Sequence, residues 1–188
     1  MGVNMPEKTC DDSLALDIKN LTVHYVLEDE VVEAVNDISI QLEKRKILGL
    51  VGETGAGKTS TALAVLNLVP DPPGVIKSGS INVCGYDMLN LPQKDLEKVR
   101  GSAVSMIFQD PMTSLNPVFT VGEQIAESIL IHEECTKAQA FEKAEEMLQM
   151  VGIPRERAYE YPHQFSGGMK QRVVIAIALA CSPQLLLA

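Results

Sequence analysis

The residues with the clearest chemistry form a glycine-rich loop that could hold phosphate groups. The chain reads Gly52-x-x-x-x-Gly57-Lys58-Thr59, which is the spacing of a phosphate-binding loop. Glycines let the backbone curl so that successive N–H groups point at one phosphate. Lys58 supplies a positive charge for the β and γ phosphates, and the Thr59 hydroxyl is a ligand that Mg²⁺ accepts. This pattern predicts a site for a nucleoside triphosphate with Mg²⁺.

The segments on either side of this loop are predicted to be a strand and a helix. Ile47–Val51 is short, apolar and flanked by polar or turn residues, which is typical of a buried strand. The apolar residues from Ala62 to Leu66 fit a short helix that ends before Pro70. A glycine-rich turn would match the loop pattern by accident in roughly one chain in a hundred of this length. The order strand, loop, helix therefore favours phosphate binding over an accidental match.

A second candidate site is a helix start that contains two glycines. Ser166-Gly167-Gly168 precedes an apolar stretch from Val173 to Cys181. Serine is a good helix N-cap, and the two glycines would let another group come close to the helix start. By itself this motif favours a plain helix cap and turn, so a functional interpretation depends on the other motifs in the chain.

Three stretches together resemble one protein family. FSGGMKQR (residues 165–172) is similar to the signature motif of ATP-binding cassette (ABC) ATPases, with Phe165 and Met169 where Leu and Gln are commoner. FQDPMTSLNP (residues 108–117) resembles the Q-loop region of the subunits that energise oligopeptide and dipeptide importers, and residues 161–188 resemble the same group. The resemblance covers nearly the whole chain. Its Q-loop and signature stretches are typical of the peptide and nickel importers.

The resemblance implies an α/β fold with a P-loop NTPase (RecA-like) core, an antiparallel β subdomain and an inserted α-helical subdomain, incomplete at the C-terminus. A disordered N-terminus is expected before the partial ABC ATPase domain of residues 14–188, because the first dozen residues are polar. The expected divisions are the disordered residues 1–13, the β subdomain and P-loop core (14–110), the helical subdomain (111–164), and the signature helix with the start of the Walker B strand (165–188).

Local patterns predict where strands and helices begin. Apolar side chains alternate along much of residues 14–42, which indicates β-strands. Thr120 with Glu123, and Thr136 with Gln139, have the spacing of capping boxes. We therefore expect strands in the first part of the chain and two helix starts in the middle.

One departure from the family lies in the turn before the P-loop strand. Arg45-Lys46 stands where the family usually has Gly-Glu. A residue other than glycine would cost about 1 kcal/mol at this position if the turn requires a positive φ.

The resemblance also implies roles for individual residues around ATP. Tyr25 would stack on adenine, although its place in an alternating run is also typical of an ordinary strand residue. Gln109 would reach Mg²⁺ and the attacking water, and its loop would sense the membrane subunits; a strand-ending turn before Pro111 is the alternative. Thr59 and Gln109 would hold the Mg²⁺. The residues expected to bind ATP are Tyr25, Gly52, Glu53, Thr54, Gly55, Ala56, Gly57, Lys58, Thr59, Ser60 and Gln109.

The signature residues would act on the ATP of another subunit. By resemblance, the γ-phosphate held by a partner's P-loop would be contacted by Ser166, Gly167, Gly168 and Gln171. Each complete site would then need two chains. The implied partners are a second ABC ATPase subunit (in a homo- or heterodimer), two integral membrane permease subunits and, indirectly, a solute-binding protein. The chain would lie at the cytoplasmic face of the plasma membrane, bound through the permeases.

The carboxylates that support hydrolysis in this family are expected beyond the last residue. The strand that starts at Leu185 would run into an Asp and a Glu, so no catalytic residue is predicted within this chain. Phosphoryl transfer depends on positioned water and neutralised charge, so we expect very weak or no hydrolysis by this chain alone. The predicted function is an ATP-binding, energy-coupling subunit of an ABC importer for peptides or related small solutes. The alternative is a truncated, hydrolysis-incompetent nucleotide-binding fragment without transport activity of its own.

The composition excludes some other classes of function. A formal net charge of −9 disfavours nucleic acid as the main partner, because phosphate contacts need basic patches. No apolar run reaches the length of a membrane span, so membrane association is expected through protein partners. A kinase is disfavoured by the signature motif, and a soluble ABC protein of translation or DNA repair by the acidic charge and the Q-loop stretch. The transported solute (dipeptide, oligopeptide or nickel) stays open.

Overall fold

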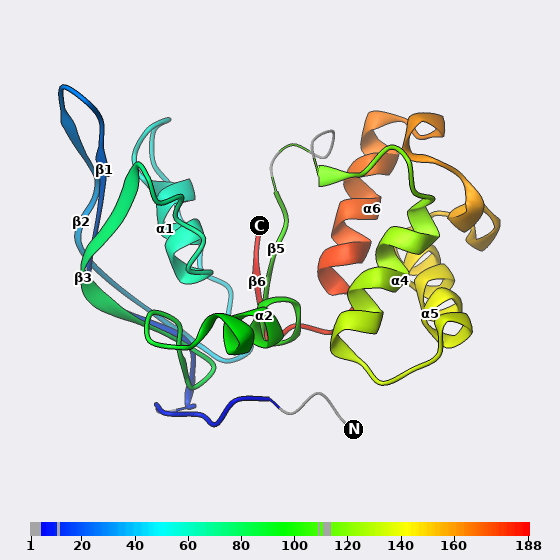
Figure 1. Cartoon of the computed structure of the whole chain (residues 1–188), viewed down its shortest axis with the longest axis horizontal. Helices are drawn as coiled ribbons and strands as arrows, with labels where there is room; N and C mark the ends of the chain where they lie inside the picture. The colour runs from blue at the N-terminus through cyan, green and yellow to red at the C-terminus, as the bar shows by residue number, and fades with distance from the viewer. Residues whose placement is uncertain (1–4, 11, 109, 111–113) are drawn as a thin grey trace. The chain divides into compact units, whose positions relative to one another are not determined.

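The structure is a computed structural model that describes residues 5–10, 12–108, 110 and 114–188. The chain forms two compact units, one of residues 6–97 and one of residues 98–188 together with Met5 (Figure 1). Each unit has its own secondary structure and its own core. The phosphate-binding loop belongs to the first unit and the signature helix to the second.

The unit of residues 6–97 is built on an antiparallel sheet. Its strands are β1 (Leu14–Val26), β2 (Val31–Glu43), β3 (Gly74–Val83) and β4 (Tyr86–Asp87), in the order β2-β1-β3-β4. This confirms the β-strands expected from the alternating pattern. The helix α1 (Lys58–Val65) follows the phosphate-binding loop and contacts β1, β2 and β3 (Figure 1). The helix α2 (Gln93–Ser102) follows the sheet in the chain; its residues 93–97 belong to this unit and residues 98–102 to the other.

The alternation of buried residues along β1 changes phase at a bulge. Leu16 and Ile18 are buried, and after Asn20 the buried side chains are those of Leu21 and Val23. Asn20 has a φ of 49°, and the pairing of β1 with β2 shifts register between Ile18 and Leu21. A bulge inserts one extra residue and returns the apolar side chains to the same face. The phase change is therefore what keeps one side of β1 in the core.

The predicted strand at Ile47–Val51 does not form, and this prediction is wrong. These residues belong to neither sheet in the described part of the chain, and Ile47 and Val51 are 100% and 91% exposed. A strand is held by backbone hydrogen bonds to its neighbours, which an apolar run cannot supply by its own composition. The apolar composition therefore indicates that this segment favours burial. It does not indicate a strand, because no neighbouring strand pairs with these residues in the described part of the chain.

The turn before this segment contains a strained residue. Arg45 has a φ of 62°, and the Lys46 amide donates to the Glu43 carbonyl over 3.3 Å. The left-handed conformation costs an ordinary side chain about 1 kcal/mol relative to glycine. Arg45 therefore occupies a position that glycine would fill without strain.

Replacing Arg45 with glycine is expected to stabilise this turn. The free energy of unfolding should rise by about 0.5–1 kcal/mol, because strain is relieved while some chain entropy is lost. Urea denaturation of the two proteins measures the change. Lys46→Gly is the matched control, because Lys46 does not have a positive φ and the same substitution there should lower stability. A fall in stability for Arg45→Gly would contradict the prediction.

Among the described residues before β1, Thr9 and Cys10 depart from the expected disorder. Along the described residues 5–10 and 12–13, the amides of Thr9 and Cys10 donate to the Gly85 carbonyl over 3.0 and 3.1 Å. The Lys8 ammonium lies 5.7 Å from the centre of the Tyr86 ring. A polar composition predicts disorder only when the backbone finds no partner. Here the turn after β3 offers an acceptor, so these residues are held against the sheet.

The unit of residues 98–188 is mostly helical. It contains β5 (Val104–Met106), which pairs in parallel with β6 (Leu185–Leu187). Its helices are α4 (Val121–His132), α5 (Lys137–Met150) and α6 (Gly167–Leu179), with short 3₁₀ helices η1 (Arg155–Tyr159) and η2 (Pro162–Gln164). In the part of the chain that the structure describes, no helix combines the length and apolar character needed to cross a membrane.

The helix starts of this unit follow the predicted caps. Thr120 with Glu123, and Thr136 with Gln139, form complete capping boxes at α4 and α5, which confirms both predictions. Each box satisfies two backbone amides that the first turn of a helix leaves open. The three long helices then pack around one apolar cluster, whose fully buried members include Val121, Ile125, Ile129, Ala140, Ala144, Leu148 and Val173. This core supports the start of α6.

Candidate nucleotide site

The glycine-rich loop forms a tight curl immediately before α1. The Ala56 amide donates to the Glu53 carbonyl over 3.1 Å, which closes a turn within the loop. Gly55 and Gly57 have φ values of 86° and 79°, a region that side chains rarely adopt. The loop therefore has the curled backbone conformation that the spacing of its glycines predicts.

Gly57 is also required by a close approach to the sheet. A Cβ atom at this position would lie 2.1 Å from the Ala34 carbonyl oxygen of β2. No real Cβ atom comes so close to an oxygen, so only glycine lets the loop rest on β2 in this way. At Gly55 an added Cβ would meet nothing within 4 Å. The two glycines thus serve different needs: Gly55 supplies conformation, and Gly57 supplies conformation and contact.

The start of α1 presents open backbone amides beside the loop. The N-cap is Gly57, which has no side chain to bind them, and the first turn holds no acidic residue. The first helical bond runs from the Thr61 amide to the Gly57 carbonyl over 2.8 Å. The amides before Thr61 have no partner within the helix, and the helix dipole places positive charge there. This arrangement suits an anion such as a phosphate.

The Lys58 side chain folds back over the loop. Its ammonium donates to the carbonyl oxygens of Gly52 and Glu53, each over 2.7 Å. A charged donor that bridges two carbonyls holds the loop in a closed curl. Because Lys58 is the first residue of α1, its ammonium can exchange these carbonyls for the oxygens of a phosphate bound at the helix start.

Tyr25 and Ser60 lie together at the edge of this site. The Tyr25 hydroxyl donates to Ser60 Oγ over 3.3 Å and joins the end of β1 to the first turn of α1. The tyrosine is half-buried, and a Cβ at Gly74 would lie 3.0 Å from its Cε1 atom. The structure thus brings together two residues that are 35 positions apart in the sequence.

Two residues of the site were not predicted from the sequence. Ala34 contributes only its carbonyl oxygen under Gly57, and nothing in the residue type signals that role. Gly74 leaves room for the Tyr25 ring, and its position at the start of β3 was the only available signal. Both act through the backbone, which sequence patterns report poorly.

A cavity of about 400 Å³ adjoins the loop within the same unit. Its lining includes the apolar residues Ile38, Ile40, Leu50 and Val51, the polar residues Asn36, Ser39 and Thr61, and Ala56 and Lys58 from the loop and the start of α1. Its apolar part offers no N–H donors for a phosphate. We therefore place the candidate phosphate site at the edge of the cavity that the loop and the start of α1 form.

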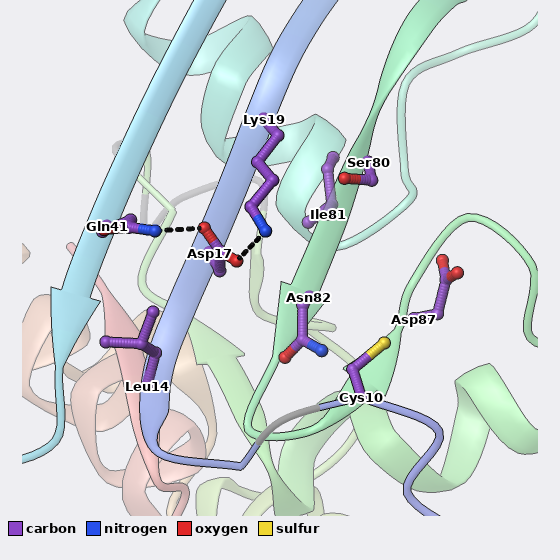
Figure 2. Close-up of a pocket in the computed structure, with 9 residues that line it drawn as sticks. All are labelled: Cys10, Leu14, Asp17, Lys19, Gln41, Ser80, Ile81, Asn82 and Asp87. Carbon is purple, nitrogen blue, oxygen red and sulfur yellow. Dashed lines mark hydrogen bonds and ion pairs between the residues drawn. The ribbon is translucent and has the colours of Figure 1, made fainter.

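A second cavity, of about 310 Å³, lies on the sheet near β1 and β3 (Figure 2). Figure 2 shows the Asp17 carboxylate between two partners. Gln41 Nε2 donates to it over 3.0 Å, and the Lys19 ammonium lies 3.1 Å away. Asn82 also accepts a hydrogen bond, from the Gly85 amide over 2.9 Å. Because these polar groups bind one another, the cavity carries no comparable signal for a ligand.

The signature residues form an exposed helix start in the other unit. Ser166 is the N-cap of α6, and its hydroxyl oxygen accepts from the Met169 amide over 3.4 Å. Ser166, Gly167, Gly168 and Gln171 are all exposed. A Cβ atom at Gly167 or Gly168 would meet nothing within 4 Å. The packing of this chain therefore does not require glycine at either position, and the space above the helix start is open.

Gln109, which was predicted to bind ATP and Mg²⁺, lies outside the described residues. Next to it, Phe108 is 45% exposed. The Ser114 hydroxyl donates to the Asp110 carbonyl over 2.8 Å. The role of Gln109 thus stays a prediction.

Comparison with known proteins gives close relatives of nearly the whole chain. A probable peptide ABC transporter ATP-binding protein of Sinorhizobium fredii is 46% identical over 177 residues, which are 93% of this chain and 53% of that protein. The oligopeptide transport ATP-binding protein OppD of Bacillus subtilis is 46% identical over 175 residues, 92% of this chain and 49% of its own length. OppD of Escherichia coli is 47% identical over 175 residues, with 92% and 51% covered. The chain thus spans about half the length of the curated relatives it matches.

Solved structures and a family match give the fold and the family. A dimeric ATP-binding cassette in a post-hydrolysis state bound to ADP and Pi superposes with a TM-score of 0.81 at 24% identity, over 91% of this chain and 72% of that chain. A dimeric bacterial ABC transporter cassette gives the same values. This likeness confirms the predicted α/β fold of the P-loop NTPase type. Because residues 35–188 match the family described as ABC transporter, the chain belongs to that family.

Proposed function

We propose that this chain is the ATP-binding part of an energy-coupling subunit of an importer for peptides or related small solutes. The observation that carries the proposal is the loop of residues 52–57, curled under the Lys58 ammonium beside the open amides of α1. The relatives are named as oligopeptide and dipeptide transport ATP-binding proteins, which supports peptides as the solute class. ATP binding and hydrolysis would drive the transport.

Within the site, each residue has a physically suited role. The backbone of residues 52–57 would cradle the phosphates, Lys58 would neutralise their charge, and Ser60 would lie beside them. The half-buried Tyr25 would stack on adenine, since its ring is held next to the first turn of α1. The Thr59 side chain is exposed in that turn, so its hydroxyl is free to act as an oxygen ligand.

Magnesium fits the donors that this site offers. The exposed Thr59 hydroxyl is an oxygen ligand of the kind Mg²⁺ takes, and Gln109 would add a second. When bound, Mg²⁺ would neutralise charge on the β and γ phosphates. The protein would then orient the nucleotide through the loop amides and Lys58.

The signature residues would complete the site of a second subunit. Ser166, Gly167, Gly168 and Gln171 are exposed, and the two glycines leave space that this chain does not use. The two solved structures named above are dimeric cassettes, which supports a partner of the same fold. The further partners would be two permease subunits and, through them, a solute-binding protein. The subunit would therefore work at the cytoplasmic face of the membrane.

Replacing Lys58 with alanine tests the proposal. Titration calorimetry with MgATP should show binding to the unaltered chain and an affinity lower by about 30–100-fold in Lys58→Ala, because a charge-assisted contact to phosphate is lost. Lys46→Ala is the control: it removes an exposed lysine outside the loop and should change the affinity by less than about twofold.

Equal affinities of the unaltered chain and Lys58→Ala would contradict the proposal. Phosphate release, measured on the same samples, distinguishes a subunit that hydrolyses ATP from a module that only binds it. Release that depends on Lys58 would identify hydrolysis at this site.

A further inference from the structure

The guanidinium of Arg157 contacts residues on both sides of the signature helix start. We propose that Arg157 is a positioning residue: it holds Ser166, Gly167 and Gly168 in the orientation that receives a partner's ATP. This inference rests on the proposed function of the signature residues. Arg157 lies in η1, nine positions before Ser166, and no sequence motif marks it.

All three nitrogens of the guanidinium are engaged. Nε and Nη2 donate to Oε2 of Glu160 over 2.9 and 2.6 Å, and Nη2 also donates to the Gln164 carbonyl over 3.1 Å. Nη1 lies 3.3 Å from the Met169 sulfur. The Cζ atom lies 4.5 Å from the centre of the Phe165 ring. One planar group therefore joins η1, the end of η2 and the first turn of α6.

These contacts bracket the exposed part of the motif. Phe165 is 5% exposed and Met169 is partly buried, whereas Ser166, Gly167 and Gly168 between them are exposed. The exposed residues receive no packing of their own, since a Cβ on either glycine would meet nothing within 4 Å. Beyond the hydrogen bonds that Ser166 and Gly168 make within α6, their orientation depends on the two flanking anchors. Arg157 contacts both.

A fixed helix start matters because mobile groups lose conformational freedom when they bind, and this loss lowers the affinity. Amides and a serine hydroxyl that already point in one direction bind a phosphate without losing that freedom. Lysine cannot replace arginine here. Its compact ammonium lacks the planar fork that reaches a carboxylate, a carbonyl and a ring face together.

A neighbouring arginine provides a matched control. Arg155 lies two positions earlier in the same 3₁₀ helix and points to α5: its Nε donates to Gln149 over 2.6 Å, and its Nη2 lies 3.8 Å from Glu146. It therefore has the same charge and secondary structure as Arg157 but contacts a different helix.

The test compares two properties of the full chain in the variants Arg157→Ala, Arg157→Lys, Glu160→Gln and Arg155→Ala. The first is MgATP affinity by calorimetry; the second is MgATP-dependent association of two copies by sedimentation. Arg157→Ala and Arg157→Lys should weaken association by about tenfold or more and leave MgATP affinity within about twofold, since the phosphate-binding loop lies in the other unit. Glu160→Gln should give a smaller loss of association, and Arg155→Ala should match the unaltered chain.

Hydrogen exchange separates local positioning from general unfolding. In Arg157→Lys the amides of residues 166–169 should exchange faster, while those of α4 and α5 keep their protection. The lysine variant keeps a charge and an apolar stem, so it remains informative if Arg157→Ala does not fold.

Two failures can be told apart. If the unaltered chain binds MgATP but does not associate, the proposed contact of the signature with a partner's ATP is wrong, and the role of Arg157 fails with it. If the unaltered chain and Arg157→Lys associate equally well, the signature function stands and the positioning role alone is wrong. An equal loss of association in Arg155→Ala would also overturn the positioning role. The loss would then come from removing a positive charge near the helix, and not from removing the contacts of Arg157.

Discussion

Gly57→Ala should abolish nucleotide binding by this chain, with the affinity for MgATP lowered by about a hundredfold or more, equivalent to about 3 kcal/mol. The new methyl group would lie 2.1 Å from the Ala34 carbonyl oxygen, and the residue would have to keep a φ of 79°. Neither the carbonyl nor the helix start can move without disturbing the sheet or the loop. The loop would therefore leave β2, and its amides would no longer converge on a phosphate. Calorimetry with MgATP measures the loss.

Gly55→Ala is the control that isolates the contact with β2. Gly55 also has a positive φ, of 86°, but an added Cβ would meet nothing within 4 Å. The variant should suffer only backbone strain of about 1–2 kcal/mol and keep measurable binding. Circular dichroism checks that both variants remain folded. If Gly57→Ala binds MgATP as well as Gly55→Ala does, the packing of the loop on β2 is not what forms the site.

Gly168→Asp should separate stability from ATP-dependent association. The melting temperature should stay the same or rise: the side chain enters open space, replaces a helical glycine, and places a negative charge in the first turn of α6. Association of two copies in MgATP should nevertheless fall by about a hundredfold, because a carboxylate would face the γ-phosphate of the partner. Sedimentation with and without MgATP gives the association, and thermal unfolding gives the stability.

Gly168→Ala distinguishes charge from size at the same position. Alanine also removes the flexibility of glycine, and it adds only one methyl group. It should raise stability by about 0.5–1 kcal/mol and weaken association less than Gly168→Asp does. Normal MgATP-dependent association of Gly168→Asp would show that the signature does not meet a phosphate. The affinity of each single chain for MgATP should be unchanged in both variants.

Local chemistry allowed several elements to be predicted from the sequence. The capping boxes at Thr120 and Thr136 form as expected, because a cap involves residues only three positions apart. The same holds for Ser166 at the start of α6 and for the curl of the phosphate-binding loop, in which Gly55 and Gly57 have a positive φ. These predictions required no knowledge of distant parts of the chain.

The errors occurred where a distant partner decides the conformation. Ile47–Val51 has the composition of a strand, yet its residues are exposed and unpaired in the described structure, since pairing depends on other segments. Thr9 and Cys10 were expected to be disordered, but their amides find the Gly85 carbonyl about 75 residues further along the chain. In both cases the residue type carried no information about the partner.

By itself the sequence determined the family of the chain and the phosphate-binding loop, because motif spacing and glycine conformation are properties of short segments. Only the tertiary structure decided which backbone atoms support that loop and what holds the signature in place. Gly57 rests on the Ala34 carbonyl, and the Tyr25 hydroxyl reaches Ser60. Arg157 joins Glu160, Gln164, Phe165 and Met169 at one planar group. Such contacts depend on how separate segments are brought together in space, and so no local pattern could indicate them.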